Sequence, residues 1–311
     1  MKVIILKEAG NVENLEYVEL AKSTIEEGEV LIKVKAISIN PVDTKSRSGK
    51  GVYGRIKTEN PLILGWDISG IVEETKCSDF KVGDEVFGMV NFPGHGKAYA
   101  EYIAAPADQL TLKPKNISFI DAAATTLVAL VAYQALVHNA NIQAGQNVLV
   151  HAASGGVGHI AVQIAKYLGA KVTGTSSLKN KDFVLGLGAD AHIDYQGVDW
   201  TNARQKFDFV LDTIGGDNID HSLEVTKEGG CIISIPTGLN EVVTSKAKSK
   251  GMKAYFILVQ SSGEDMKQIA SLLQSGAVKP HVSKTFPFGQ MREAHLEQET
   301  GRTVGKIVIT L

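Results

Sequence analysis

The chain has 311 residues, a formal net charge of −2 at pH 7 and 44% hydrophobic residues. This length allows two domains with a sizeable core, and the near-neutral charge gives no reason to expect a nucleic-acid or membrane partner. The two cysteines, Cys77 and Cys231, exclude a disulfide framework and a cysteine-rich structural zinc site. We therefore expect a protein of the reducing cytoplasm.

The first third of the chain predicts an irregular β-rich domain. Val30, Ile32, Val34 and Ala36 would share one face of a strand, with Glu29, Lys33 and Lys35 on the other, and short β-like runs follow at 62–74, 83–90 and 98–106. Asn40-Pro41 ends the first β region, because proline has no N–H to donate to a ladder. The polar, glycine-bearing segment 40–54 is long enough to be a functional loop. The apolar run near the N-terminus is too short for a signal peptide, and no later segment is expected to span a membrane.

Helical and then alternating patterns fill the middle of the chain. Ser118 opens a helix that runs to about His138, with Asp121 completing a near capping box. Strands are then predicted at 148–151, 171–175, 191–194, 207–212, 231–235 and 254–259, with helices before most of them. A helix near 263–275 and a β-like tail at 304–310 close the chain. The alternation predicts a doubly wound parallel sheet.

These patterns together predict an α/β protein with two domains. Residues 121–260 are assigned to a Rossmann dinucleotide-binding domain. Residues 1–120 and 261–311 are assigned to a discontinuous β-rich domain, because the tail is expected to return to the first domain. The predicted last strand of the parallel sheet is apolar, and its free edge makes a homodimer an expectation.

A glycine-rich turn follows the first strand of the predicted sheet. Ala153-x-Gly155-x-x-Gly158 matches the dinucleotide fingerprint G-x-G-x-x-G, with alanine in the first slot. The turn lies between a strand and an amphipathic helix, which is the context that the fingerprint requires. A glycine lets a pyrophosphate approach the backbone, and the N–H groups at the helix start can bind it.

The residues beyond the second predicted strand indicate which nicotinamide cofactor binds. About twenty residues after the glycines, an NAD-binding unit places an acid that holds the ribose 2′-hydroxyl. Residues 173–180 contain no acid, and Ser176, Ser177, Lys179 and Lys181 lie there or next to it. Hydroxyl and ammonium groups would hold a 2′-phosphate that a carboxylate would repel. NADPH is expected, and the alternative is an ordinary solvated Ser/Lys loop.

A set of motifs spread over the chain resembles one branch of the medium-chain dehydrogenases/reductases. That branch is the zinc-independent quinone oxidoreductases and enone (alkenal/one) reductases, zeta-crystallin relatives included. The motifs are 40-NPVDTK-45, 65-GWDISG-70, 83-GDEVFG-88, 151-HAASGGVG-158, 188-GADAHIDY-195, 209-FVLDTIGG-216 and 305-GKIVI-309. The resemblance implies a GroES-like irregular β-barrel catalytic domain beside the Rossmann domain. It also implies NADPH-dependent reduction of quinones or of the C=C bond of α,β-unsaturated carbonyls.

The resemblance also implies roles for individual residues. Asn40 and Lys45 correspond to residues beside the nicotinamide ribose, Tyr195 to a tyrosine near the adenosine phosphate, and Thr213 to a small hydroxyl residue near the cofactor. The residues that correspond to the pyrophosphate cradle are Ser154, Gly155, Gly156 and Val157. One departure is Val131, which stands where the family usually has a threonine facing the nicotinamide. That hydroxyl must be missing or replaced.

No metal is expected in the site. In the zinc-dependent relatives the catalytic ligands fall at the positions of Asn40, Trp66 and Leu127, and none of these side chains is a zinc ligand.

The chemistry requires a hydride at the β-carbon, a proton at the α-carbon and a donor near the carbonyl oxygen. Lys45 is the candidate donor, although it could also position the cofactor or be a solvated lysine. Tyr53 corresponds to a tyrosine of quinone oxidoreductases and could donate the proton or line the substrate site, with water as the alternative proton source. Asp67 is expected to hold local backbone.

Two other functions stay open at this point. The first is an enoyl-thioester reductase, and the second is a non-catalytic NADPH-binding crystallin or partner protein. The presence of Lys45 and Asn40 together with an intact fingerprint favours the enzyme, because a scaffold needs neither residue.

Overall fold

The computed structural model describes residues 1–203, 205–236 and 241–311. The chain divides into two compact units. The first unit contains Met1–Leu130, Val259–Gly276 and Pro280–Leu311, and the second contains Val131–Leu258 and Ala277–Lys279. The division at Leu130 falls within helix α3 (Phe119–Tyr133). The first unit is therefore made of segments from both ends of the chain.

The first unit is built on an irregular, mainly antiparallel sheet. In the described part of the chain its strand order is β14-β15-β3-β4-β5-β7, and β6 pairs with β3. These strands are β3 (Glu29–Ile39), β4 (Asp67–Thr75), β5 (Glu85–Met89), β6 (Tyr102–Pro106), β7 (Leu110–Leu112), β14 (Val282–Pro287) and β15 (Lys306–Thr310). The pairing of β3 with β4 shifts register twice, and such bulges bend and twist a sheet. The unit also contains the strands β1 (Lys2–Leu6) and β2 (Leu15–Glu19), the helices α1 (Pro41–Arg47), α2 (Tyr53–Ile56), α8 (Gly263–Gln274) and α9 (Met291–Glu299), and the short turns η1 (Val12–Asn14), η2 (Ala107–Gln109) and η6 (Phe288–Gln290).

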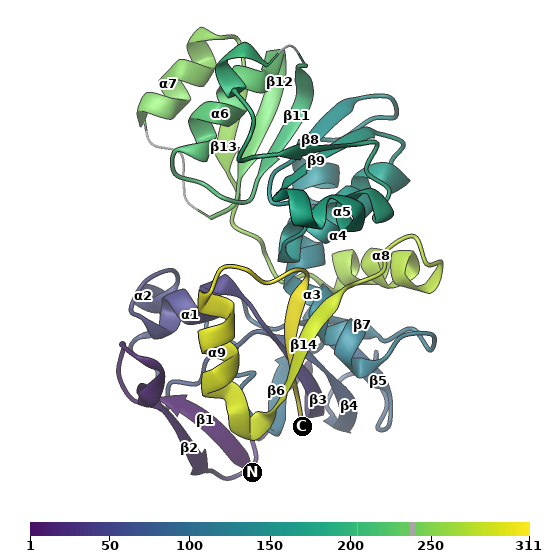
Figure 1. Cartoon of the computed structure of the whole chain (residues 1–311). Coiled ribbons are helices and arrows are strands. Elements are labelled where there is room, and N and C mark those ends of the chain that lie inside the picture. The colour runs from purple at the N-terminus through teal and green to yellow at the C-terminus, as the bar shows by residue number, and fades with distance from the viewer. Residues whose placement is uncertain (204, 237–240) are drawn as a thin grey trace. The chain divides into compact units, whose positions relative to one another are not determined.

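The C-terminal strand completes the sheet of this unit. β15 runs antiparallel to β3, with Ile307 opposite Ile39 and Thr310 opposite Ala36. Ile307, Val308 and Ile309 are fully buried. Helix α9 contacts both β14 and β15, as Figure 1 shows in yellow. The tail is therefore part of the core formed by the first residues of the chain.

The second unit is a doubly wound parallel sheet (Figure 1). Its described strands follow the order β10-β9-β8-β11-β12-β13, in which the chain moves outward from β8 in both directions. They are β8 (Asn147–Val150), β9 (Lys171–Ser176), β10 (Ala191–Asp194), β11 (Phe207–Asp212), β12 (Thr226–Ser234) and β13 (Lys253–Phe256). Its helices are α4 (Gly156–Tyr167), α5 (Lys181–Gly186), α6 (Asn218–Val225) and α7 (Glu241–Ser249), with the short turns η4 (Leu178–Asn180) and η5 (Trp200–Asn202). This order confirms the predicted Rossmann sheet.

Burial explains why these segments form a parallel sheet. Val148, Leu149 and Val150 have no exposed surface, as expected of a central strand covered by helices on both faces. β13 lies at one edge of the sheet, and Phe256 at its end is 38% exposed.

The prediction of a loop at 40–54 is wrong. Residues Pro41–Arg47 form helix α1, and Tyr53–Ile56 form helix α2. Asn40 is the N-cap of α1, Pro41 occupies its first turn, and the carboxylate of Asp43 accepts the Asn40 N–H at 2.8 Å. Proline is favoured at a helix start, since its fixed φ suits the helix and its missing N–H has no partner there. The proline that ends β3 therefore also begins α1.

The expectation that no later segment could span a membrane also needs correction. Phe119–Asn139, which combines α3 with the π-helical segment η3 (Gln134–Asn139), is long and apolar enough to cross a membrane. However, 72% of its apolar window is buried inside the structure, as is typical of the core helix of a soluble protein. The predicted start of the helix is confirmed, because the Ser118 hydroxyl accepts the Asp121 N–H at 3.0 Å.

Candidate active site

The glycine turn presents an open helix N-terminus. Helix α4 begins after Gly155, which is extended at the N-cap, and no side chain caps the helix. Its first turn contains no acidic residue. The turn before the helix is fixed by two backbone hydrogen bonds, from Ala153 N–H to Thr175 O and from Gly155 N–H to Ala152 O, both 2.8 Å. The first N–H groups of α4 are therefore available to an anion.

Close packing explains the glycines that follow. A Cβ at Gly158 would lie 2.2 Å from the carbonyl oxygen of Ala152, and one at Gly174 would lie 2.6 Å from Cγ1 of Val184. Both distances are too short for any side chain. A Cβ at Gly155 would meet only the Ala152 oxygen, at 3.2 Å. Gly158 thus packs helix to strand, while Gly155 keeps the approach to the backbone open, as a dinucleotide pyrophosphate requires.

The end of β9 carries the predicted 2′-phosphate residues. Ser176 is the last residue of β9, is 4% exposed and lies with its hydroxyl 2.8 Å from Nε2 of His192. Ser177 is half-buried at the start of η4, and Lys179 is exposed. Neither Lys179 nor Lys181 forms an ion pair with another described residue. Their ammonium groups are therefore available to a phosphate.

Two residues near this position are not among the predicted site residues. The Asn180 amide donates to the Ser154 hydroxyl at 3.1 Å, which ties the loop after β9 to the glycine turn. His192, on β10, holds Ser176. The sequence offers one signal for His192. It is a titratable residue inside the predicted strand 191–194, which follows the strand that ends near Ser176.

Tyr195 and Thr213 follow the carboxyl ends of β10 and β11. Tyr195 is 50% exposed, and the Thr213 hydroxyl donates to the carbonyl oxygen of His151 at 2.8 Å. Because the strands are parallel, these residues lie with the glycine turn and Ser176 at the end of the sheet where the carboxyl ends of the strands meet. Doubly wound sheets bind ligands at the carboxyl ends of their strands.

In the first unit, a buried polar cluster surrounds Asn40. The Asn40 amide nitrogen donates to Asp67 Oδ2 at 2.8 Å, and Lys306 donates to the Asn40 amide oxygen and to the Ile39 carbonyl oxygen. Asp67 also accepts the Leu127 N–H at 3.1 Å, so it holds local backbone as expected. Asn40 is 1% exposed, and its side-chain amide is hydrogen-bonded to Asp67 and Lys306. One amide hydrogen is left for another partner.

Burial dominates the electrostatics of this cluster. Burial, and after it the nearby Asp67 carboxylate, raise the pKa of Asp43 to about 7. Burial also raises the pKa of Asp67, while Lys306 opposes that shift. Burial lowers the pKa of Lys306 to about 8, opposed by Asp67 and Asp43. The ammonium and the carboxylates therefore depend on one another to remain charged.

Lys45 and Tyr53 lie on the two short helices. Lys45 is exposed on α1, and Tyr53 is half-buried as the first residue of α2. Within the described residues, neither side chain has a hydrogen bond or an ion pair with another part of the chain. Both polar groups can therefore reach a bound molecule.

Two residues near α2 have structural roles. The indole of Trp66 is fully buried and donates to the carbonyl oxygen of Gly94 at 2.7 Å. Nε2 of His95 accepts the Ile63 N–H at 3.1 Å, and Nδ1 lies 3.1 Å from Glu59. The side chain of His95 is only 8% exposed, so His95 is not the surface histidine that its glycine-rich loop 92–97 suggests.

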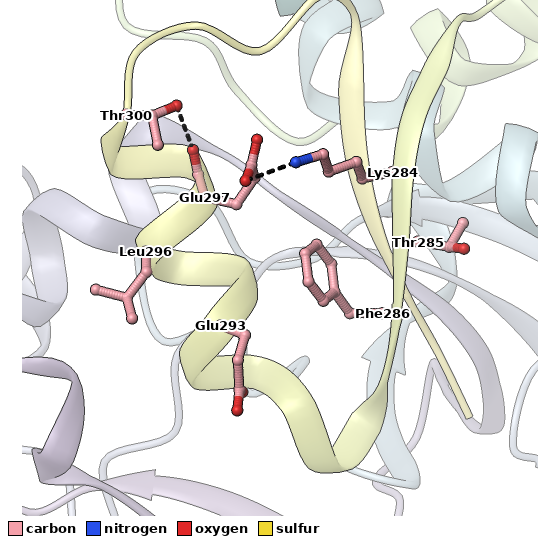
Figure 2. Close-up of a pocket in the computed structure, with 7 residues that line it drawn as sticks. All are labelled: Lys284, Thr285, Phe286, Glu293, Leu296, Glu297 and Thr300. Carbon is pink, nitrogen blue, oxygen red and sulfur yellow. Dashed lines mark hydrogen bonds and ion pairs between the residues drawn. The ribbon is translucent and has the colours of Figure 1, made fainter.

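A shallow groove of about 540 Å³ lies between β14 and α9 (Figure 2). It is lined by Lys284, Thr285, Phe286, Glu293, Leu296, Glu297 and Thr300. The Lys284 ammonium crosses it to Glu297 at 2.8 Å. None of the predicted site residues lines this groove.

Comparison with known proteins gives the family. The family described as "Alcohol dehydrogenase GroES-like domain" matches residues 26–115, and the family described as "Zinc-binding dehydrogenase" matches residues 187–309. The chain is 35% identical to the 2-methylene-furan-3-one reductase of Solanum lycopersicum, over 93% of this chain and 74% of that protein. It is 34% identical to the chloroplastic NADPH-dependent alkenal/one oxidoreductase of Arabidopsis thaliana, over 99% and 79%. The solved quinone oxidoreductase of Coxiella burnetii matches with a TM-score of 0.94 and 36% identity, over 100% and 99%.

The chain therefore belongs to the medium-chain dehydrogenase/reductase superfamily, in the branch of quinone and alkenal/one oxidoreductases. It is an oxidoreductase that uses a nicotinamide cofactor. The family, the GroES-like and Rossmann architecture and the oxidoreductase function predicted from the motifs are confirmed.

Proposed function

We propose that the protein is an NADPH-dependent reductase of quinones or of the C=C bond of α,β-unsaturated carbonyl compounds, and that it works without zinc. One observation at the carboxyl ends of the Rossmann strands carries this proposal. An uncapped helix N-terminus and an acid-free Ser/Lys loop lie there, at the ends of the neighbouring strands β8 and β9. Relatives named as an alkenal/one oxidoreductase and a quinone oxidoreductase support the substrate class.

Each group of residues has a distinct task in this proposal. The α4 N-terminus with Ser154, Gly155, Gly156 and Val157 holds the pyrophosphate. Ser176, Ser177, Lys179 and Tyr195 face the adenosine 2′-phosphate, and Asn40, Lys45 and Thr213 act toward the nicotinamide end. When bound, NADPH supplies the hydride. Lys45 stabilises the negative charge that develops on the carbonyl oxygen, and Tyr53 or water supplies the proton.

The cofactor preference is tested by equilibrium binding. We expect NADPH to bind at least about tenfold more tightly than NADH, which corresponds to about 1.4 kcal/mol. The reason is that residues 173–180 offer hydroxyls and an ammonium, and no carboxylate, at the 2′ position. Fluorescence titration of both cofactors measures the ratio. Equal affinities would contradict the preference.

The absence of a zinc requirement follows from what surrounds Asn40 and Trp66. The Lys306 ammonium donates to the Asn40 amide oxygen, so a zinc ion there would meet a positive charge in a buried place. In the described part of the chain, no group of three or more His, Cys, Asp or Glu residues could hold a metal ion. We expect chelators to leave activity unchanged. Stoichiometric zinc in elemental analysis of the active protein, lost together with activity on chelation, would contradict this.

Parallel assays test the proposed reaction against its alternatives. NADPH oxidation is measured with a short enone, a quinone and a crotonyl thioester at matched concentrations. We expect turnover of the enone or the quinone to exceed that of the thioester. Preference for the thioester would favour an enoyl-thioester reductase. NADPH binding without turnover of any of the three would favour the binding protein.

A further inference from the structure

His192 lies at the strand end where the 2′-phosphate is expected. β9 and β10 are parallel neighbours, with His192 opposite Gly174 and Asp194 opposite Ser176. Nε2 of His192 is 2.8 Å from the Ser176 hydroxyl, which can also donate to the Ser177 carbonyl oxygen at 3.1 Å. Ser176 is 4% exposed, so this hydroxyl has few alternative partners.

The protonation of His192 decides what the Ser176 hydroxyl can offer. A hydroxyl has a single hydrogen. When Nε2 of a neutral imidazole accepts that hydrogen, the serine presents only lone pairs to an incoming anion. When the imidazole is protonated, Nε2 donates to the serine oxygen, and the hydroxyl hydrogen becomes free to donate elsewhere.

We propose that His192 is a positioning residue for the 2′-phosphate of NADPH, which in its protonated form orients Ser176 as a donor and adds a positive charge beside Lys179 and Lys181. This inference rests on the proposed NADPH preference. It gives Ser176 a defined role toward the phosphate and makes the affinity for NADPH depend on pH.

The charges around His192 set the direction of that dependence. Burial lowers the pKa of His192 from its ordinary value, Asp194 on the same strand raises it, and Lys181 of α5 lowers it. From β9, the group that reaches the imidazole is the neutral Ser176 hydroxyl. Free His192 is therefore mainly neutral at pH 7. A bound phosphate, which carries close to two negative charges at that pH, would raise the pKa of His192.

Thermodynamic linkage determines whether the NADPH affinity rises or falls with pH. Because the pKa of His192 is higher in the complex than in the free protein, NADPH binding takes up a proton. The affinity for NADPH should rise as the pH falls through the pKa of the complex, and level off below the pKa of the free protein. NADH has no 2′-phosphate, so its affinity should lack this component.

The experiment compares His192→Val, which suits a strand but cannot bind a proton, with the wild type. NADPH and NADH are titrated by fluorescence between pH 5.5 and 8.5, and proton uptake is measured by calorimetry in two buffers. Between the ends of that range, we expect the NADPH affinity of the wild type to rise roughly tenfold more than that of the variant. The 2′-phosphate titrates in both proteins, so the difference isolates His192. His221→Gln, which removes an exposed imidazole from the same unit, should behave as the wild type.

A second variant separates the charge of His192 from its hydrogen bond. His192→Asn retains a hydrogen-bonding group without a titrating one, and it should bind NADPH with the shallow pH dependence of the valine variant. Identical pH dependence in the wild type and both variants, or the same dependence with NADH, would overturn the inference. If the wild type binds NADPH no more tightly than NADH, the proposed cofactor preference itself fails. A clear NADPH preference with no effect of His192 would remove this inference alone.

Discussion

Replacing Lys45 by methionine is expected to lower kcat on an enone by roughly a hundredfold or more, since loss of one donor to a developing oxyanion costs about 2.7–4 kcal/mol. Lys45 is exposed on α1 and has no described partner inside its unit, so its ammonium is available to a substrate oxygen. An ammonium stabilises the charged transition state more than the neutral ketone. Its loss should therefore lower kcat more than it raises KM.

Steady-state kinetics with both substrates varied, together with an NADPH titration, separates the roles of Lys45. If Lys45 only positions the cofactor, NADPH affinity should fall while kcat at saturation survives. Lys50→Met is the matched control, because Lys50 is an exposed lysine five positions further along the same segment. Unchanged kcat and unchanged NADPH affinity in the Lys45 variant would contradict both roles. Tyr53 and water would then remain as the candidates.

Replacing Lys306 by methionine is expected to destabilise the first unit by about 3–5 kcal/mol, the usual cost of leaving a buried charge without its partner. Lys306 is 3% exposed and donates to Asn40, whose amide in turn holds Asp67. Without the ammonium, the buried carboxylates of Asp43 and Asp67 face each other uncompensated. A neutral side chain of similar length cannot replace that charge.

The destabilisation by Lys306→Met should depend on pH. A carboxyl group whose pKa is raised on folding favours the folded state at low pH, and this stabilisation is lost as the pH rises from the unfolded value through the folded one. The pKa of Asp43 is already about 7 with Lys306 present. The destabilisation by Lys306→Met should therefore be largest above pH 7 and shrink toward pH 4.

Urea unfolding at several pH values measures the effect, followed by the fluorescence of Trp66 in a Trp200→Phe background. The control is Lys284→Met, which removes the exposed ammonium that pairs with Glu297. Exposed pairs contribute about 0–1 kcal/mol, so the control should change little. Equal effects of the two substitutions would show that the cluster around Asn40 does not depend on the Lys306 charge.

The Rossmann sheet was predictable because its signals are local. The strands β10 and β11 were predicted with the bounds that the structure has, Ala191–Asp194 and Phe207–Asp212. Each is a short run bounded by polar or turn residues, and the glycine turn between β8 and α4 fixes the direction of the chain. The order of the strands follows from right-handed crossovers once the helices are placed.

Other features depended on partners far away in the chain. Lys306 and Asn40 are 266 residues apart, and no periodicity connects them. The pairing of Ser176 with His192 needed the register of two parallel strands, which neither strand encodes alone. The helix at Pro41–Arg47 is different, because its signal is local but ambiguous. Asparagine followed by proline is typical of a strand end, and also of an N-cap and the first residue of a helix.

Deuterium transfer from labelled NADPH to an enone is the most direct test of the proposed reaction. NADPH carrying deuterium in place of the transferred hydrogen is incubated with the protein and a short enone, and the product is analysed by mass spectrometry and NMR. The proposed reaction gives the saturated ketone with one deuterium on the former β-carbon, and a proton from water on the α-carbon. An unlabelled ketone, an allylic alcohol labelled at the carbonyl carbon, or unreacted enone under conditions where NADPH is bound would contradict enone reduction by this protein.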